Sequence, residues 1–151
     1  MKNKLVPFLV AALVMFNCTA VNSMADADWS TDYTAALKQA KESGRPVLVD
    51  FTGSDWCGWC IKLDKEVFSQ QAFKDYAKDN LVLLQLDFPR AKPQTDEVKK
   101  QNQELAGKFG IRGYPTIVLV DSEGKELART GYQAGGAEKY VEHLKKLLEK
   151  K

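Results

Sequence analysis

Two short, nearly continuous apolar runs lie in the middle of the chain, at 47–51 and 81–87. Runs of this length without alternation are typical of strands that are buried on both faces of a sheet. A third apolar run at 116–120 is followed by a polar turn at 121–124, which predicts a hairpin into another strand at 125–130. The pattern therefore predicts a central sheet of about four strands.

Helical periodicity fills the segments around these strands. Long crossovers connect the first three strands, whereas the last connection is a hairpin, so we expect a mixed sheet with helices on both faces. This is an α/β architecture. The helices are predicted from polar caps and from apolar residues spaced three and four apart: from Ser30 or Thr31 to about Glu42, over 61–68, from Ser69 to Asn80, from Thr95 to Phe109, and over 137–150.

The first 25 residues have the pattern of a secretory signal peptide. Lys2 and Lys4 precede an apolar core at 5–16, and the small residues at 23–25 form a cleavage site. We therefore expect residues 1–25 to be a signal peptide and residues 26–151 to be one exported, periplasmic domain, with 44% hydrophobic residues in the whole chain.

Two other interpretations of this segment are less favoured. An uncleaved membrane anchor would need a longer apolar run. A lipoprotein would use Cys18, but Phe16 and Asn17 make a poor lipid-attachment site.

Removal of the signal peptide changes the charge and the cysteine count. It takes two of the 22 basic residues and no acidic one, which leaves 20 basic residues against 20 acidic ones. A neutral domain lacks the basic surface of a nucleic-acid-binding protein. Cys57 and Cys60 are the cysteines that remain, and two cysteines are too few for a disulfide framework.

Cys57 and Cys60 lie where the strand at 47–51 passes into a helix. Unpaired N–H groups at a helix N-terminus favour a thiolate over a thiol. The thiolate attacks disulfides, and a second thiol three residues later can resolve the mixed disulfide. The spacing therefore predicts thiol–disulfide exchange, with Cys57 as the nucleophile and Cys60 as the resolving cysteine.

A cysteine pair also serves in zinc sites, in c-type haem attachment and in structural disulfides. A zinc site needs two more ligands, and the one histidine, His143, is in the distant last helix. Ile61 follows Cys60 where c-type haem attachment requires a histidine. A purely structural disulfide stays as an alternative, and we expect no metal and no cofactor.

Asp50 is an acidic residue inside an apolar strand. If its carboxyl is buried, loss of solvation raises its pKa, and the group becomes a suitable proton acceptor for the Cys60 thiol. The alternative is that strand alternation turns Asp50 toward solvent.

Three segments together resemble the thioredoxin superfamily: 49–51 (Val-Asp-Phe), 56–60 (Trp-Cys-Gly-Trp-Cys) and 110–116, which contains Tyr114-Pro115. The resemblance runs from about Asp32 to the C-terminus. It implies the thioredoxin fold, exchange with protein thiols and disulfides, and a buried Asp50.

The resemblance also implies roles for neighbouring residues. Tyr114-Pro115 matches the family's cis-proline, which lies against the cysteine pair and exposes backbone to an extended substrate. From sequence alone, a trans proline that opens an edge strand is favoured. Trp56 and Trp59 would form an apolar platform around Cys57.

The chain departs from the family pattern at three places. The connector from Asp50 to Cys57 is one residue longer than usual. Leu83 stands where thioredoxins often place a lysine near the buried acid. Residues 88–104 resemble an insertion.

These observations predict an exported thiol–disulfide oxidoreductase that acts on protein substrates, in the reducing direction, with a membrane or periplasmic electron donor. Gly58 and the lack of a histidine between the cysteines favour the reducing direction, whereas the helix N-terminus acts against it. The alternatives are a thioredoxin-fold binding module whose cysteines staple a loop, and an oxidase or isomerase of disulfides. No dimerisation segment is visible, so we expect a monomer.

Overall fold

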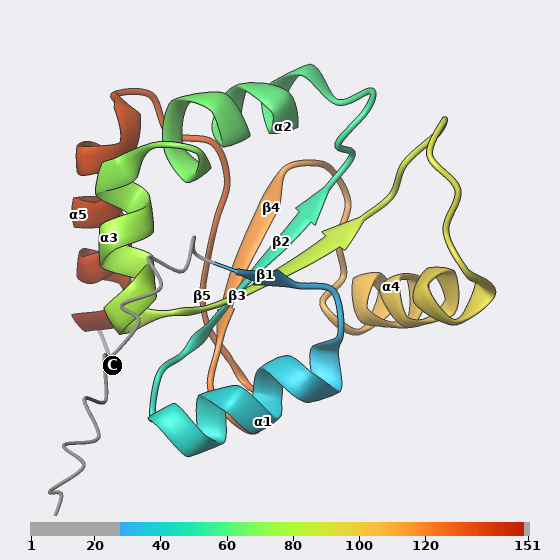
Figure 1. The fold of residues 1–151 in the computed structure, drawn as a ribbon, viewed down its shortest axis with the longest axis horizontal. Coiled ribbons are helices and arrows are strands. Elements are labelled where there is room, and N and C mark those ends of the chain that lie inside the picture. The colour runs from blue at the N-terminus through green and yellow to red at the C-terminus, as the bar shows by residue number, and fades with distance from the viewer. Residues whose placement is uncertain (1–27, 150–151) are drawn as a thin grey trace, which may run out of the picture.

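The computed structural model describes residues 28–149, which form a layered α/β domain (Figure 1). The predicted signal peptide, including Cys18, lies outside the described residues. The centre of the domain is a five-stranded sheet, and the strands follow one another across it in the order β1 (Trp29–Ser30), β3 (Val82–Asp87), β2 (Val47–Thr52), β4 (Thr116–Val120) and β5 (Glu126–Thr130).

The sheet is mixed, as the sequence predicted. Strand β3 pairs in parallel with both β1 and β2, whereas β4 is antiparallel to both β2 and β5. The fifth strand, β1, was not expected. Two residues are too short to show a period, and β1 is held by pairing with β3 and by the Trp29 ring, whose centroid lies 5.1 Å from that of Phe68.

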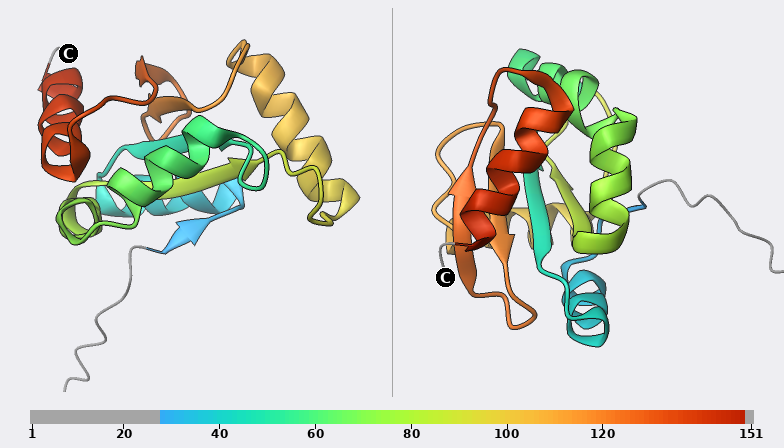
Figure 2. Two further views of the ribbon diagram at one scale, coloured as in Figure 1. Left: turned by 90° about the horizontal axis from the view of Figure 1, so that it is seen from above. Right: turned by 90° about the vertical axis from the view of Figure 1, so that its left-hand side faces the viewer.

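Helices cover both faces of the sheet (Figures 1 and 2). On one face α3 and α5 lie side by side, together with α2 and the π-helix η1, and on the other lie α1 and α4. The bounds are α1 (Tyr33–Ser43), α2 (Gly58–Leu63), η1 (Asp64–Phe68), α3 (Gln71–Asn80), α4 (Asp96–Lys108) and α5 (Gly136–Glu149).

The helix starts differ from the predicted ones at two places. Asp32, rather than Ser30 or Thr31, caps α1, and its carboxylate accepts a hydrogen bond from the Ala35 N–H at 3.0 Å. Ser69 ends η1 instead of capping α3. Both errors arise because several adjacent polar residues can serve as a cap, and tertiary packing selects among them.

The start of α4 agrees with the prediction. The Thr95 hydroxyl accepts a hydrogen bond from the Val98 N–H at 3.3 Å, and Asp96 and Glu97 lie in the first turn, where negative charge is favourable.

Strand β2 is buried along its whole length because both of its faces are covered. Val49 and Phe51 pack toward α1 and α4, and Leu48 packs toward the face of α2, α3 and α5. Asp50 follows the same alternation as Leu48. Its side chain is therefore buried, with 3% of its surface exposed, and the solvent-facing alternative is wrong.

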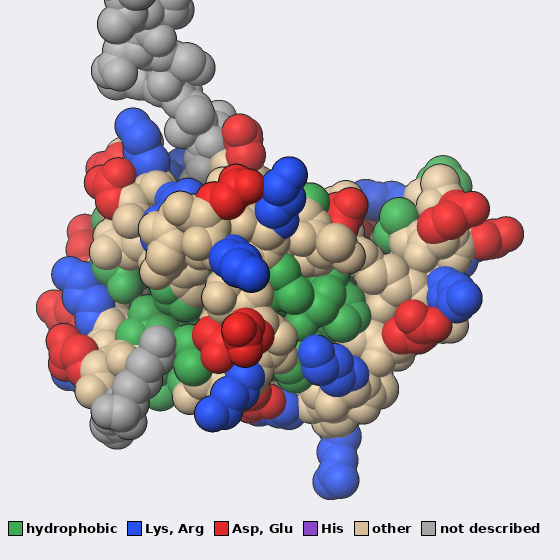
Figure 3. Space-filling model, turned by 90° about the horizontal axis from the view of Figure 1, so that it is seen from below, with side chains coloured by type: hydrophobic (Ala, Val, Ile, Leu, Met, Phe, Trp, Pro, Cys, Tyr) green, Lys and Arg blue, Asp and Glu red, His purple; other side chains and the backbone are tan. Residues whose placement is uncertain are grey.

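The end of the molecule opposite α2 carries acidic and basic side chains intermixed around apolar areas (Figure 3). Among the helices of residues 28–149, none is long and apolar enough to cross a membrane.

The difference between the central and the edge strands predicts a difference in stability. Leu48→Ala in β2 should lower the free energy of unfolding by about 2–5 kcal/mol, because a fully buried side chain leaves a cavity. The same change at the half-buried Leu127 in β5 should cost clearly less. Urea denaturation of both variants measures this, and equal losses would contradict the assigned layers.

Candidate active site

The cysteine pair lies at the turn from β2 into α2, at the top of Figure 1. Cys57 is the N-cap of α2 with an extended backbone (φ −87°, ψ 104°), and Cys60 lies in the first turn. The Cys57 sulfur accepts the Cys60 N–H at 3.3 Å. A thiolate at this position would receive the same hydrogen bond, which favours the ionised form.

Cys57 and Cys60 form a disulfide with their Cα atoms 5.2 Å apart. Both residues are largely covered, with 7% of Cys57 and 4% of Cys60 exposed. Because the exposures differ so little, the two cysteines differ mainly in position: Cys57 precedes the helix, whereas Cys60 is inside it.

The Asp50 carboxyl lies in a buried, acidic environment. Burial, and then the neighbouring carboxylates of Asp64 and Asp87, raise the pKa of Asp50 from 3.8 to about 8. A hydrogen bond from the Gln85 side chain acts in the opposite direction. Asp50 Oδ1 has no hydrogen-bond partner within residues 28–149.

The β-sheet register explains which side chain faces Asp50. Gln85 is its partner on β3, whereas Leu83 lies opposite Leu48. Gln85 is therefore the β3 residue that gives Asp50 a polar partner, a neutral amide. Asp64 is the C-cap of α2, one turn after Cys60, and the charge of its carboxylate raises the pKa of Asp50.

The connector before Cys57 is fixed by close packing and by hydrogen bonds. The Trp56 indole lies so close over Gly53 that a Cβ atom on Gly53 would come within 2.5 Å of the ring. The Ser54 N–H and hydroxyl both donate to the Asp87 carboxylate, at 2.9 and 2.6 Å. The Trp56 Nε1–H donates to the Phe88 carbonyl at 2.7 Å.

The loop between α4 and β4 contains a cis peptide bond between Tyr114 and Pro115, as the family resemblance implied. The Tyr114 ring meets the Trp56 ring edge-on, with centroids 5.8 Å apart, and lies 5.2 Å from the Phe88 ring. These contacts join the residue before Cys57 to the residue before Pro115.

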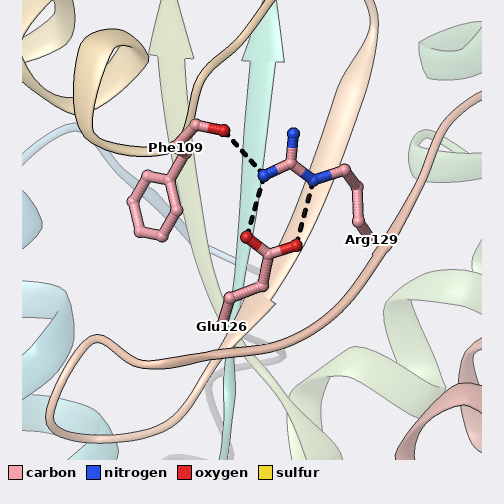
Figure 4. A network of polar contacts seen from close by, with 3 residues as sticks. All are labelled: Phe109, Glu126 and Arg129. Atoms are coloured by element: carbon pink, nitrogen blue, oxygen red, sulfur yellow. Dashed lines mark hydrogen bonds and ion pairs between the residues drawn. The ribbon is translucent and has the colours of Figure 1, made fainter.

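A side chain on β5, that of Arg129, forms a hydrogen bond to the start of this loop. One Arg129 nitrogen donates to the Phe109 carbonyl at 2.6 Å and to the Glu126 carboxylate at 2.8 Å (Figure 4). The hydrogen bonds from Arg129 lower the pKa of Glu126.

Trp59 lies between the two cysteines in the first turn of α2 and is 57% exposed. Its ring centroid is 5.1 Å from that of Tyr132, and the Lys62 ammonium lies 5.2 Å from both rings. Glu66 accepts a hydrogen bond from the Tyr132 hydroxyl at 2.7 Å and pairs with Lys62 at 3.9 Å. Trp59 is therefore a supported, exposed aromatic surface.

The structure joins Cys57 to Cys60, sets the Tyr114 ring against Trp56 and buries Asp50 in β2. It also adds residues that the sequence did not single out. Asp64 had a local signal, because it lies four residues after Cys60, one turn further along the same helix face. Gln85 and Tyr132 had none, since their positions depend on strand register and on the approach of α5. Within residues 28–149, no three His, Cys, Asp or Glu side chains group in a way that could hold a metal ion.

Comparison with known proteins places the chain in a family. A family model for a thioredoxin-like domain matches residues 33–148. The disulfide bond reductase DsbH of Chlamydia pneumoniae is 39% identical over 124 residues, which cover 82% of this chain and 74% of that protein. The thioredoxin-related protein DsbJ of the same organism is 36% identical, over 68% of this chain and 30% of its own length.

A solved structure of a DsbH oxidoreductase matches with a TM-score of 0.79 at 38% identity, over 84% of this chain and 88% of that one. A putative disulphide-isomerase from Bacteroides thetaiotaomicron matches with a TM-score of 0.56 at 26% identity, over 80% and 90% of the two chains. With the family model spanning most of the sequence, the chain belongs to the thioredoxin-like family and is a thiol–disulfide oxidoreductase of that family.

Proposed function

We propose that this protein is an exported oxidoreductase that reduces protein disulfides in the periplasm through Cys57, Cys60 and Asp50. The observation that carries the proposal is the disulfide at the start of α2, together with a buried carboxyl in the preceding strand whose pKa is near that of a thiol. The 39% identity to a disulfide bond reductase supports the reducing direction.

The reaction begins with the reduced protein. The Cys57 thiolate attacks one sulfur of the client disulfide, which forms a mixed disulfide and releases one client thiolate. The Cys60 thiol then loses its proton and attacks the Cys57 sulfur, which releases the second client thiolate and forms the Cys57–Cys60 disulfide. Two electrons have passed to the client, so a membrane or periplasmic thiol donor must reduce the pair again.

Asp50 is the proposed acceptor of the Cys60 proton. A base is most effective when its pKa is near the operating pH and near the pKa of the group it deprotonates. Burial and the Asp64 and Asp87 carboxylates bring Asp50 into this range. Because Asp50 must be ionised to accept a proton, the resolving step should accelerate as the pH rises toward 8.

The client chain is proposed to bind along the cis-proline loop. Tyr114 and Pro115 would pair with its backbone, and Trp56 and Trp59 would contact its side chains on the two sides of the disulfide. Both Tyr114 and Pro115 are half-buried, so part of each stays accessible.

The Asp50→Asn variant separates a chemical role from a structural one. In wild type, the folded state keeps the Asp50 proton up to a pH of about 8, whereas the unfolded chain loses it near 3.8. Stability therefore falls as the pH rises between these values, by at most about 1.4 kcal/mol per pH unit. The oxidised Asp50→Asn protein should lack this slope and be more stable at pH 7, as measured by urea denaturation at several pH values.

The same variant should resolve mixed disulfides more slowly, with an unchanged rate of first attack by Cys57. Rapid-mixing kinetics with a model mixed disulfide measure both steps. Lower stability, or equal slowing of both steps, would contradict the role of Asp50 as a base.

Trapping experiments test the roles of the two cysteines. Cys60→Ser should accumulate mixed disulfides with oxidised client proteins, since nothing resolves the Cys57 adduct. Cys57→Ser should trap none, and both variants should fail to reduce insulin. If wild type does not reduce insulin and neither variant traps a client, the protein acts as a binding module.

The direction of exchange is tested by equilibrium with glutathione. Known pairs range from about −270 mV for thioredoxin to about −120 mV for a strong oxidant. We expect the Cys57–Cys60 pair to lie nearer the reducing end, because the residues between the cysteines include no histidine and Asp50 adds nearby negative charge when ionised. A value near −120 mV would instead favour the oxidase alternative.

A further inference from the structure

The connection between β3 and α4, residues 88–95, is hydrogen-bonded to the connector that precedes Cys57. Its anchor is the Asp55 carboxylate, which accepts hydrogen bonds from three successive backbone N–H groups, those of Arg90, Ala91 and Lys92, at 2.7–3.2 Å. The backbone of this connection is therefore fixed next to the cysteine turn.

The anchoring places the Arg90 side chain over Trp56. The guanidinium carbon lies 4.0 Å from the centroid of the Trp56 ring, which is a cation–π contact. Gly53 approaches the same indole closely, the Tyr114 ring meets it, and its N–H is bonded to Phe88. The surface around Trp56 therefore includes a guanidinium group as well as the half-buried indole.

The Arg90 side chain is exposed, and its guanidinium contacts the Trp56 ring. Within residues 28–149, no carboxylate forms an ion pair with its guanidinium, and Asp55 is occupied by backbone donors. Lys92, by contrast, donates to the Ser54 hydroxyl at 3.0 Å, and that hydroxyl in turn donates to the Asp87 carboxylate.

The surroundings of Trp59 have a different character. Trp59 and Ile61, both in α2, are exposed large apolar side chains, at 57% and 47%. The nearby cation, Lys62, is paired with Glu66. The two tryptophans therefore differ: Trp59 lies beside exposed apolar surface and an ion-paired lysine, whereas Trp56 is covered by a guanidinium that forms no ion pair within residues 28–149.

We propose that Arg90 is a specificity-determining residue that binds a carboxylate next to the client disulfide. A guanidinium that is already held by stacking and by its fixed backbone loses little freedom when it forms a two-pronged contact with a carboxylate. The protein therefore reacts faster with disulfides flanked by Asp or Glu than with disulfides flanked by Lys. This inference rests on the proposed function, because it assigns the kind of client that the same site prefers.

The test uses two disulfide-linked peptides that differ in one position beside the cysteine, Glu in one and Lys in the other. Wild type should reduce the Glu peptide with a kcat/KM about fivefold to tenfold higher, mainly through a lower KM. Arg90→Gln should bring the two values close together, whereas Arg90→Lys should keep part of the preference because it keeps the charge. The preference of wild type should shrink in 0.5 M salt, as expected of an exposed charge pair.

Lys38→Gln is the matched control. It removes one positive charge from the exposed face of α1, at the end of the domain opposite α2, and should keep the full preference for the Glu peptide. Equal reduction of both peptides by wild type, or equal slowing of both by Arg90→Gln, would overturn the role of Arg90 and leave the proposed function standing. A wild-type protein that reduces neither peptide would contradict the proposed function itself.

Discussion

The covering of both faces of strand β2 by helices is the constraint on which the rest of the site depends. It leaves no solvent-facing side to the strand, so an acid at position 50 has to be buried. Burial disfavours the charged form and raises the pKa of Asp50 to about 8, and the acidic neighbours Asp64 and Asp87 act in the same direction. Burying this carboxyl lowers the stability of the fold, and the same burial gives Asp50 a pKa that suits thiol chemistry.

The cysteine turn is held mostly by parts of the chain that are distant in sequence. Ser54 and Asp55 bond to residues about thirty-five positions later, and Trp56 contacts both the β3–α4 connection and the cis-proline loop. Arg129 secures the start of that loop from β5 (Figure 4). Rigid support of this kind keeps a reactive pair in position without restricting access of a client to one face.

The two tryptophans next to the cysteines have chemically different surroundings. Trp56 is half-buried and covered by the Arg90 guanidinium, whereas Trp59 is exposed and contacts the Tyr132 ring and the Lys62 ammonium. One residue type thus serves two purposes, because its surroundings come from different elements. Selectivity of a thiol–disulfide exchange site can be set in this way without any change to the cysteines.

The sequence by itself determined the features that depend on neighbours along the chain. The apolar runs located β2, β3 and β4, the polar turn located the β4–β5 hairpin, and the cysteine pair at a strand–helix boundary indicated the chemistry. The cis bond before Pro115 followed from family resemblance, since an isolated X-Pro bond is usually trans.

The tertiary structure alone decided what depends on register and on layer order. Strand β1 has too few residues for a pattern, and Gln85 meets Asp50 because the register of β2 with β3 pairs them. Arg90 lies over Trp56, although the two residues are 34 positions apart. Arg90 belongs to a connection without helical or strand structure, so its sequence has no period from which this contact could be predicted. The sequence pattern indicates which residues prefer burial, but it does not indicate which distant residues lie next to a buried group. Here those distant neighbours raise the pKa of Asp50 and place a guanidinium over the residue before Cys57.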